Sequence, residues 1–286
     1  MLWGTTGTAA SFLPTSVSPL ATGAATMAIG GILLFAVFAT PSIAALRANV
    51  TRHWLALGAL GVVVYPLAFY SAMDLAGVAI GNIVALGSAP VFAALLEWLF
   101  ERRRPGIRWV VSTAIAVLGI VLLASLGREQ ADGAGGGMTA GVLLGLLAGL
   151  AYAIYTYASS RAMAAGAQPL GAMGGMFGLG AVPLLLVLIL LGGALVQSPS
   201  SLAVIAYLAI GPMFLAYVLF GLGLRTIRSS TATTITLLEP IVATLLAVFV
   251  VGERFGPFGW IGIALVLVGV AVTATARQSG RQSLSP

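Results

Sequence analysis

The chain has 286 residues, of which 60% are hydrophobic and only 7% are charged, with a mean hydropathy of +1.10. Soluble domains carry about 25% charged residues, so this composition excludes a protein that covers itself with a polar surface. The absence of cysteine excludes disulfides, thiolate nucleophiles and cysteine-ligated metals. The net charge of +6 comes from arginines in short loops between apolar runs, where it indicates membrane topology rather than nucleic-acid binding.

Apolar runs long enough to cross about 30 Å of hydrocarbon recur along the whole chain. Residues 143–153 and 182–191 are apolar on every face, whereas barrel strands alternate apolar and polar side chains. We therefore expect an all-α polytopic membrane protein, because helices satisfy their own backbone groups inside lipid. Ten transmembrane helices are predicted, at roughly residues 1–13, 18–39, 54–73, 77–99, 107–126, 138–160, 169–196, 201–222, 231–251 and 257–276.

The first predicted span is short. A helix from Met1 to Leu13 would reach only about 20 Å, which is too short for a span and leaves open whether the native N-terminus is longer. The segment has neither a basic n-region nor a small-residue cleavage site, so we do not expect a secretory signal peptide.

The arginines are distributed unevenly between the two sets of loops. If the N-terminus is cytoplasmic, eleven arginines lie in inner loops or the C-terminal tail, and only Arg128 and Arg254 lie in outer loops. Cytoplasmic loops carry the excess of basic residues, so both termini are expected in the cytoplasm, at a bacterial-type inner membrane. The eleven are Arg47, Arg52, Arg102, Arg103, Arg104, Arg108, Arg161, Arg225, Arg228, Arg277 and Arg281.

Sequence landmarks recur at an offset of about 150 residues. They pair Leu2-Trp3-Gly4 with Ala151-Tyr152-Ala153, Ser18-Pro19-Leu20 with Gln168-Pro169-Leu170, Pro90 with Pro240, and Trp109 with Trp260. Five spans per half is an odd number, so the second half must insert upside down relative to the first, as in many secondary transporters. We expect a first five-helix repeat at 1–127, a linker at 128–137 and an inverted second repeat at 138–279.

Five short segments of the sequence resemble those of a known family. They are Trp3-Gly4, Ser18-Pro19-Leu20, Ala89-Pro90-Val91-Phe92, Leu238-Glu239-Pro240 and Gly252-Glu253-Arg254. The chain resembles the EamA-type drug/metabolite transporters over both halves, and within that superfamily it looks most similar to the YddG-type exporters of aromatic and other amino acids. The resemblance implies a ten-helix basket with a central cavity that opens alternately to either side. The chain departs from the pattern at the short first span.

Glu239 lies about nine residues into the ninth predicted span, where a carboxylate is costly and indicates function. It could couple export to a proton or contact a substrate amine. Alternatively, it caps backbone groups freed by Pro240 or joins two helices. Pro90 and Pro240 each remove a backbone donor, so each is a candidate hinge or a static bend. Ala89 precedes Pro90, so the chemistry of Glu239 occurs once per chain.

The other candidate cavity residues are uncharged. Tyrosine suits amphipathic solutes because a flat apolar face ends in a polar tip, although tyrosines near span ends, such as Tyr70, Tyr207 and Tyr217, could belong to the interfacial aromatic belt. Ser88 could instead bond its own helix. The complete set of predicted substrate-binding residues is Trp3, Thr6, Tyr65, Tyr70, Asn82, Ser88, Tyr152, Tyr155, Thr234 and Glu239.

Few ionisable side chains lie at depth, which argues against sugar phosphates and nucleotide sugars as cargo. We predict a secondary transporter that exports small amphipathic metabolites, foremost aromatic or neutral amino acids. Efflux of multiple drugs or lipophilic cations is the alternative, and a channel or a non-transporting scaffold is the alternative of another class. Since HExxH, GxSxG and paired intramembrane aspartates are missing, we expect no enzyme, catalytic residue, cofactor or metal. The expected partners are the substrate and the bilayer, without nucleic acid; the oligomeric state is left open.

Overall fold

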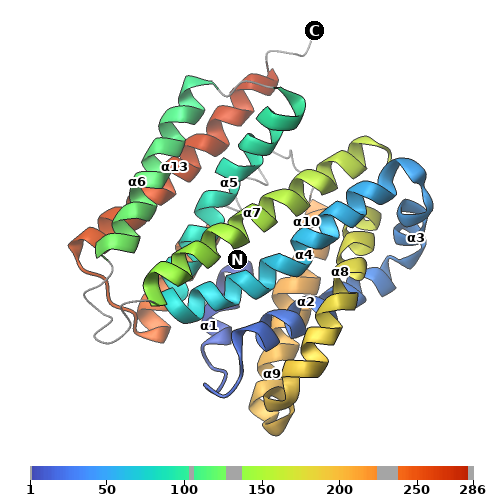
Figure 1. Ribbon diagram of the computed structural model, residues 1–286, viewed down its shortest axis with the longest axis horizontal. Coiled ribbons are helices and arrows are strands. Elements are labelled where there is room, and N and C mark those ends of the chain that lie inside the picture. The colour runs from blue at the N-terminus through green and yellow to red at the C-terminus, as the bar shows by residue number, and fades with distance from the viewer. Residues whose placement is uncertain (1, 103–105, 127–136, 224–237, 283–286) are drawn as a thin grey trace.

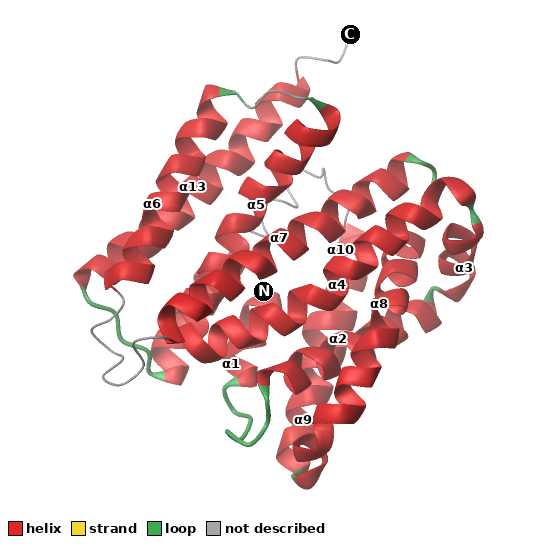
Figure 2. Cartoon of the chain, in the orientation of Figure 1, coloured by secondary structure: helices red, strands yellow, loops and turns green. Residues whose placement is uncertain are grey.

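The computed structural model describes residues 2–102, 106–126, 137–223 and 238–282, and every regular element within them is a helix (Figure 2). Six of these helices are long and apolar enough to cross a membrane. The prediction of an all-α polytopic membrane protein is therefore confirmed. The count of ten spans and the inverted repeat stay predictions, because several of the apolar helices in this part of the chain are short.

The N-terminal part starts with two short turns and continues with longer helices. Ser18 caps the first long helix, since its side chain accepts a hydrogen bond from the Ala21 N–H at 3.1 Å, and Pro19 follows at the first helical position. The elements are η1 (Leu2–Thr5), α1 (Thr6–Ala10), α2 (Pro19–Val37), α3 (Ala39–Arg47), α4 (Asn49–Ala76), α5 (Val78–Glu101) and α6 (Ile107–Leu126).

The second part is more irregular. Its elements are α7 (Gly137–Ala164), α8 (Pro169–Leu191), η3 (Gly192–Gln197), α9 (Pro199–Leu208), η4 (Ala209–Leu215), α10 (Ala216–Gly223), α12 (Leu238–Leu246), η5 (Ala247–Val251) and α13 (Pro257–Gln282). Both η4 and η5 are π-helical turns. Pro212 lies inside η4, where its missing N–H accounts for the break in the regular helical ladder.

The helices form two groups that α5 and α7 connect (Figure 1). One group is α5, α6 and α13, which lie side by side, while α2, α4, α7 and α8 pack into the other. Glycine permits the closest of these crossings. A Cβ on Gly61 of α4 would lie 2.6 Å from the Ala151 carbonyl oxygen of α7, and one on Gly23 of α2 would lie 2.6 Å from the Pro66 carbonyl oxygen. Backbones can approach this closely only where no side chain intervenes.

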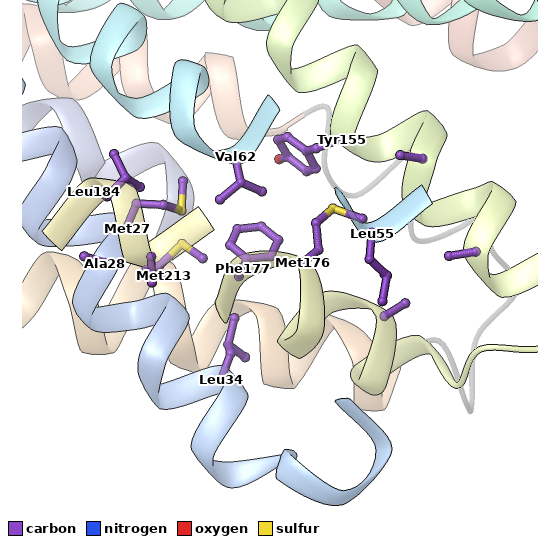
Figure 3. Close-up of a cluster of buried hydrophobic side chains, with 14 of the residues drawn as sticks. Met27, Ala28, Leu34, Leu55, Val62, Tyr155, Met176, Phe177, Leu184 and Met213 are labelled. Carbon is purple, nitrogen blue, oxygen red and sulfur yellow. The ribbon is translucent and has the colours of Figure 1, made fainter. Parts of the chain in front are cut away.

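The largest apolar cluster lies within the second group of helices (Figure 3). Phe177 of α8 is fully buried and packs among Val62 of α4, Tyr155 of α7 and Met213 of η4. Between helices that all have apolar outer surfaces, such packing rather than water exclusion stabilises the assembly. The cluster fixes α4, α7, α8 and η4 around the cavity that is described next.

Candidate functional site

A cavity of about 60 Å³ lies where α2, α4, α7, η4 and α10 meet η1, α1 and α12. Six aromatic rings and one carboxylate contribute to its lining, so we call it the aromatic cavity. Its described lining residues are Trp3, Thr6, Thr26, Met27, Tyr65, Pro66, Phe69, Tyr70, Tyr152, Pro212, Met213, Tyr217 and Glu239. The arrangement combines flat apolar faces with one carboxyl group.

The described rings of the aromatic cavity contact one another in two sets. Tyr65 stacks on Phe69, one turn later in α4, with ring centroids 5.2 Å apart, and meets Tyr152 of α7 edge-on at 5.5 Å. Trp3 meets Tyr217 edge-on at 5.2 Å, which joins η1 to α10. Both arrangements are favourable for aromatic pairs. The ring faces are therefore held at fixed spacing by their neighbours.

Tyr155 lies behind this wall rather than in it. Its side chain is 1% exposed, does not line the aromatic cavity, and packs against Tyr65 and Phe177. The Tyr155 and Tyr217 hydroxyl groups share a hydrogen bond of 3.0 Å between α7 and α10. Tyr155 thus positions a cavity-lining residue.

Glu239 is the second residue of α12, and Trp3 reaches the same cavity from η1. A close crossing brings the two elements together. A Cβ on Gly4 would lie 3.0 Å from the Glu239 carbonyl oxygen and 2.9 Å from the Val242 side chain. Because Gly4 has no side chain, η1 can pack directly on α12. Among the described lining residues, Glu239 is the only charged one.

The structure brings six of the predicted substrate-binding residues together in the aromatic cavity: Trp3, Thr6, Tyr65, Tyr70, Tyr152 and Glu239. Ser88 is buried and donates to the Ala85 carbonyl oxygen at 3.2 Å, in agreement with the alternative that it bonds its own helix. Asn82 is fully buried and does not line the aromatic cavity, and its two amide atoms have no hydrogen-bond partner in the part of the chain that the structure describes. Thr234 lies outside the described residues.

The two predicted hinge prolines occupy different helical positions. Pro90 lies inside α5, whereas Pro240 is the third residue of α12, where only the helical backbone is described. Hinge motion at either residue stays a prediction. Two further prolines, Pro66 of α4 and Pro212 of η4, lie inside helices and line the aromatic cavity.

Sequence reasoning missed part of the lining. The sequence favours the interfacial aromatic belt for Tyr217 and does not predict it as substrate-binding, yet Tyr217 lines the cavity. Phe69 could have been found because it follows Tyr65 by one helical turn and therefore shares its face. Thr26, Met27 and Met213 gave no such signal, since isolated threonines and methionines are common in apolar helices.

A second cavity of about 620 Å³ lies beside the aromatic cavity, and we call it the vestibule. It is lined by the 11–18 loop and by residues around the α4–α5 junction, with Asp74 and Glu253 among them. Tyr70 lines both cavities. Its hydroxyl donates to the Thr26 Oγ1 atom at 3.4 Å, which ties the Tyr70 side chain to α2.

Three comparisons relate the chain to known proteins. The model of the EamA-like transporter family matches residues 1–125 and 139–275. The chain is 35% identical over 280 residues to the uncharacterized transporter YwfM of Bacillus subtilis (strain 168), covering 96% of this chain and 90% of that protein. It is 25% identical over 199 residues to the uncharacterized inner membrane transporter YedA of Escherichia coli (strain K12), covering 68% and 61%.

A solved structure shows the same fold. A crystal structure that is 24% identical in sequence superposes with a TM-score of 0.66 and covers 99% of this chain and 95% of that chain. At this identity the likeness concerns the arrangement of the helices.

Proposed function

Because this chain belongs to the EamA-like transporter family of membrane transporters, we propose that it exports small amphipathic metabolites that carry an amine, foremost aromatic or neutral amino acids. Transport proceeds by alternating access through the aromatic cavity. The subgroup of YddG-type exporters remains part of this proposal, since the relatives are uncharacterized transporters.

The lining of the aromatic cavity is the observation that carries the proposal. Six rings surround a space that Glu239 also reaches. An ammonium group is attracted both by a carboxylate and by the faces of aromatic rings. A flat apolar body can pack against the remaining rings. The hydroxyls of Thr6 and Thr26 are donors that a cargo carboxylate could use.

A lipophilic cation is the second candidate cargo. The described lining has no arginine or lysine, so a full carboxylate on the cargo meets hydroxyl groups instead of a positive charge. A cation without a carboxylate needs only Glu239 and the rings. The two candidates therefore differ in whether the cargo acid group is required.

Alternating access requires parts of the chain to move relative to one another. We propose that Pro90 and Pro240 are hinges in this motion, and that residues 1–127 and 138–279 move as inverted repeats joined by 128–137. Both termini are placed in the cytoplasm, with the protein in a bacterial inner membrane.

Transport by purified protein in liposomes tests the proposed function. Vesicles loaded with unlabelled phenylalanine should take up labelled phenylalanine faster than empty vesicles, and Glu239→Gln should slow this exchange. Glu97→Gln is the matched control, because it removes a carboxylate from α5 outside the described lining. If only tetraphenylphosphonium moves, the cargo is a lipophilic cation. If neither phenylalanine nor the cation moves faster than in empty vesicles, the proposal is wrong.

A further inference from the structure

Glu253 occupies the corner between η5 and α13, and the local backbone directs its side chain away from its own helix. Gly252 adopts the left-handed conformation, with φ +83°, which a residue with a Cβ would rarely accept. The Glu253 N–H donates to the Ala247 carbonyl oxygen at 3.0 Å and closes the turn. The corner is thus a defined turn.

The Glu253 carboxylate reaches α5, which lies about 175 residues earlier in the chain. Its Oε2 atom accepts a hydrogen bond from the Ala79 N–H at 3.0 Å, and its Oε1 atom accepts one from the Val78 N–H. Val78 and Ala79 are the first two residues of α5. The first N–H groups of a helix have no partner within it and need an external acceptor.

The α5 helix has no local cap of its own. Gly77 stands at the N-cap position with φ +91° and has no side chain, while Ser, Thr, Asp or Asn would normally accept these bonds. A Cβ on Gly77 would lie 3.1 Å from the Glu253 Oε1 atom. The glycine therefore leaves the helix end open to a carboxylate supplied from another part of the chain. The negative charge also suits the positive end of the helix dipole.

The bond lies in the wall of the vestibule, between parts that the family model matches separately. Glu253, Gly77 and Val78 all line the vestibule. Val78 belongs to the match at residues 1–125 and Glu253 to the match at 139–275. A transporter that opens alternately to two sides must change how such parts meet at each end of the cavity.

We propose that Glu253 is a conformational clasp, a reversible bond to the N-terminus of α5 that holds the vestibule end in the observed state and releases when the transporter switches. The clasp rests on the proposed transport function for its role in the cycle. Its geometry gives it a specific partner, because the Val78 and Ala79 N–H groups donate one hydrogen bond to each carboxylate oxygen. Release leaves both amides open to vestibule water.

A distance measurement in the full-length protein tests the clasp. The 286-residue sequence has no cysteine, so Leu75→Cys and Phe249→Cys provide two unique label sites. Both positions are exposed, one near the C-terminal end of α4 and the other in η5. Spin-label distances in lipid nanodiscs should show one main population. Glu253→Ala should add a second population at longer distance, whereas Asp74→Ala, which removes the other vestibule carboxylate, should leave the distribution unchanged.

The conservative variant keeps the test decisive if Glu253→Ala fails to fold. Glu253→Gln retains one acceptor oxygen, so it should fold and show the longer population at a level between wild type and Glu253→Ala. The clasp would be overturned if wild type and both variants gave identical distance distributions. If only Glu253→Gln folds, a distribution identical to that of wild type would overturn it. An equal change in Asp74→Ala would also overturn it, since vestibule charge would then suffice.

Transport assays separate the clasp from the proposed function. If the distances change as expected but no cargo moves, the clasp stands and the cargo assignment fails. If cargo moves and the distances do not respond to Glu253 substitutions, the cargo assignment stands and the clasp fails. In active protein we expect Glu253→Ala to reduce exchange at least several-fold, because the observed state is no longer held.

Discussion

The hydroxyl oxygens of Tyr155 and Tyr217 lie 3.0 Å apart and join α7 to α10 behind the wall of the aromatic cavity. Only Tyr217 lines that cavity, while Tyr155 is buried in the apolar cluster. One residue of the pair therefore faces the cargo and the other holds it in place.

Loss of this hydrogen bond should lower stability. Removing the Tyr155 hydroxyl should leave the cavity lining unchanged, because Tyr155 does not line the cavity. We expect Tyr155→Phe to reduce the free energy of unfolding by about 1 kcal/mol, the usual net value of a hydrogen bond. Thermal unfolding in detergent measures the change. In the double variant with Tyr217→Phe the two losses should not add, because both remove the same bond. Full additivity would show that the hydroxyls act independently.

The crossing of α4 and α7 at Gly61 should tolerate no added methyl group. A Cβ there would lie 2.6 Å from the Ala151 carbonyl oxygen and 3.1 Å from the Tyr155 nitrogen, and neither backbone atom can move away cheaply. Gly61→Ala should cost about 1–3 kcal/mol of unfolding free energy. Gly193→Ala is the control, because no atom of the described residues lies within 4 Å of its added Cβ. Equal unfolding curves for the two variants would contradict the tight crossing.

The ring of Tyr70 should act as the partition between the vestibule and the aromatic cavity. Met27→Cys places a unique thiol in the cavity lining. In this background, Tyr70→Ala should increase the labelling rate by a small, membrane-impermeant thiol reagent added on the vestibule side. Tyr70→Phe keeps the ring and loses only the bond to Thr26, so its labelling rate should match that of Tyr70. Fast labelling in all three would show that the ring closes nothing.

Asn82 should be a source of instability. Its amide is fully buried in α5, and among the described residues neither its oxygen nor its nitrogen has a hydrogen-bond partner. An unsatisfied buried polar group costs about 1–3 kcal/mol, so Asn82→Leu should raise the free energy of unfolding. Ser88→Ala serves as a control, since Ser88 already bonds the Ala85 carbonyl oxygen. If Asn82→Leu is more stable and transports more slowly, the predicted role of Asn82 in substrate binding gains support. If the variant is less stable, the buried amide does not destabilise the protein as expected.

The clasp should respond to pH in a defined direction. Burial raises the pKa of Glu253, while the backbone N–H groups of Ala79 and Val78 act in the opposite sense and lower it. In the released state the solvated carboxyl returns to its ordinary range near 4.5. Protonation of Glu253 therefore favours the clasped state. This stabilisation of the clasped state is complete at pH values below the ordinary pKa, and it is lost as the pH rises through the raised pKa.

Spin-label distances recorded across this pH window measure the effect. The short-distance population should grow on acidification in wild type and stay constant in Glu253→Gln, which cannot titrate. The other charged groups at this corner are Asp74 in the vestibule wall and the adjacent Arg254. Asp74→Asn should keep the wild-type response; if it abolishes the response, Asp74 rather than Glu253 is the titrating group.

Local sequence patterns predicted cavity residues where these are spaced three or four apart on one helix. Tyr152 and Tyr155 are three residues apart and their rings do contact, with centroids 4.9 Å apart. Both were expected in the cavity, but Tyr152 lines the cavity and Tyr155 lies behind its wall. The packing of α10, which contacts Tyr155 through Tyr217, decides which of the two rings is covered. Glu239 was identifiable because a carboxylate in an apolar run stands out regardless of the fold.

Long-range contacts explain what sequence reasoning missed. In the sequence, Glu253 is one of two charged residues in a loop between apolar runs. Nothing near it in the chain indicates that its partners are the amides of Val78 and Ala79. The π-helical turn at Ala209–Leu215 likewise depends on how Pro212 is accommodated between neighbouring helices. That turn brings Met213 and Tyr217 to the cavity, so their roles follow from tertiary packing.

The close crossings at Gly23 and Gly61 have a consequence for selectivity. They hold α2, α4 and α7 at fixed spacing, so the edge-on contact between the rings of Tyr65 and Tyr152 belongs to a wall that backbone contact sets. Glu239 belongs to α12, which packs against α5 and η1 instead. The distance from the carboxyl group to this wall can therefore change while the wall keeps its shape. Such a cavity would be strict about the face that its cargo presents to the rings and tolerant of its length.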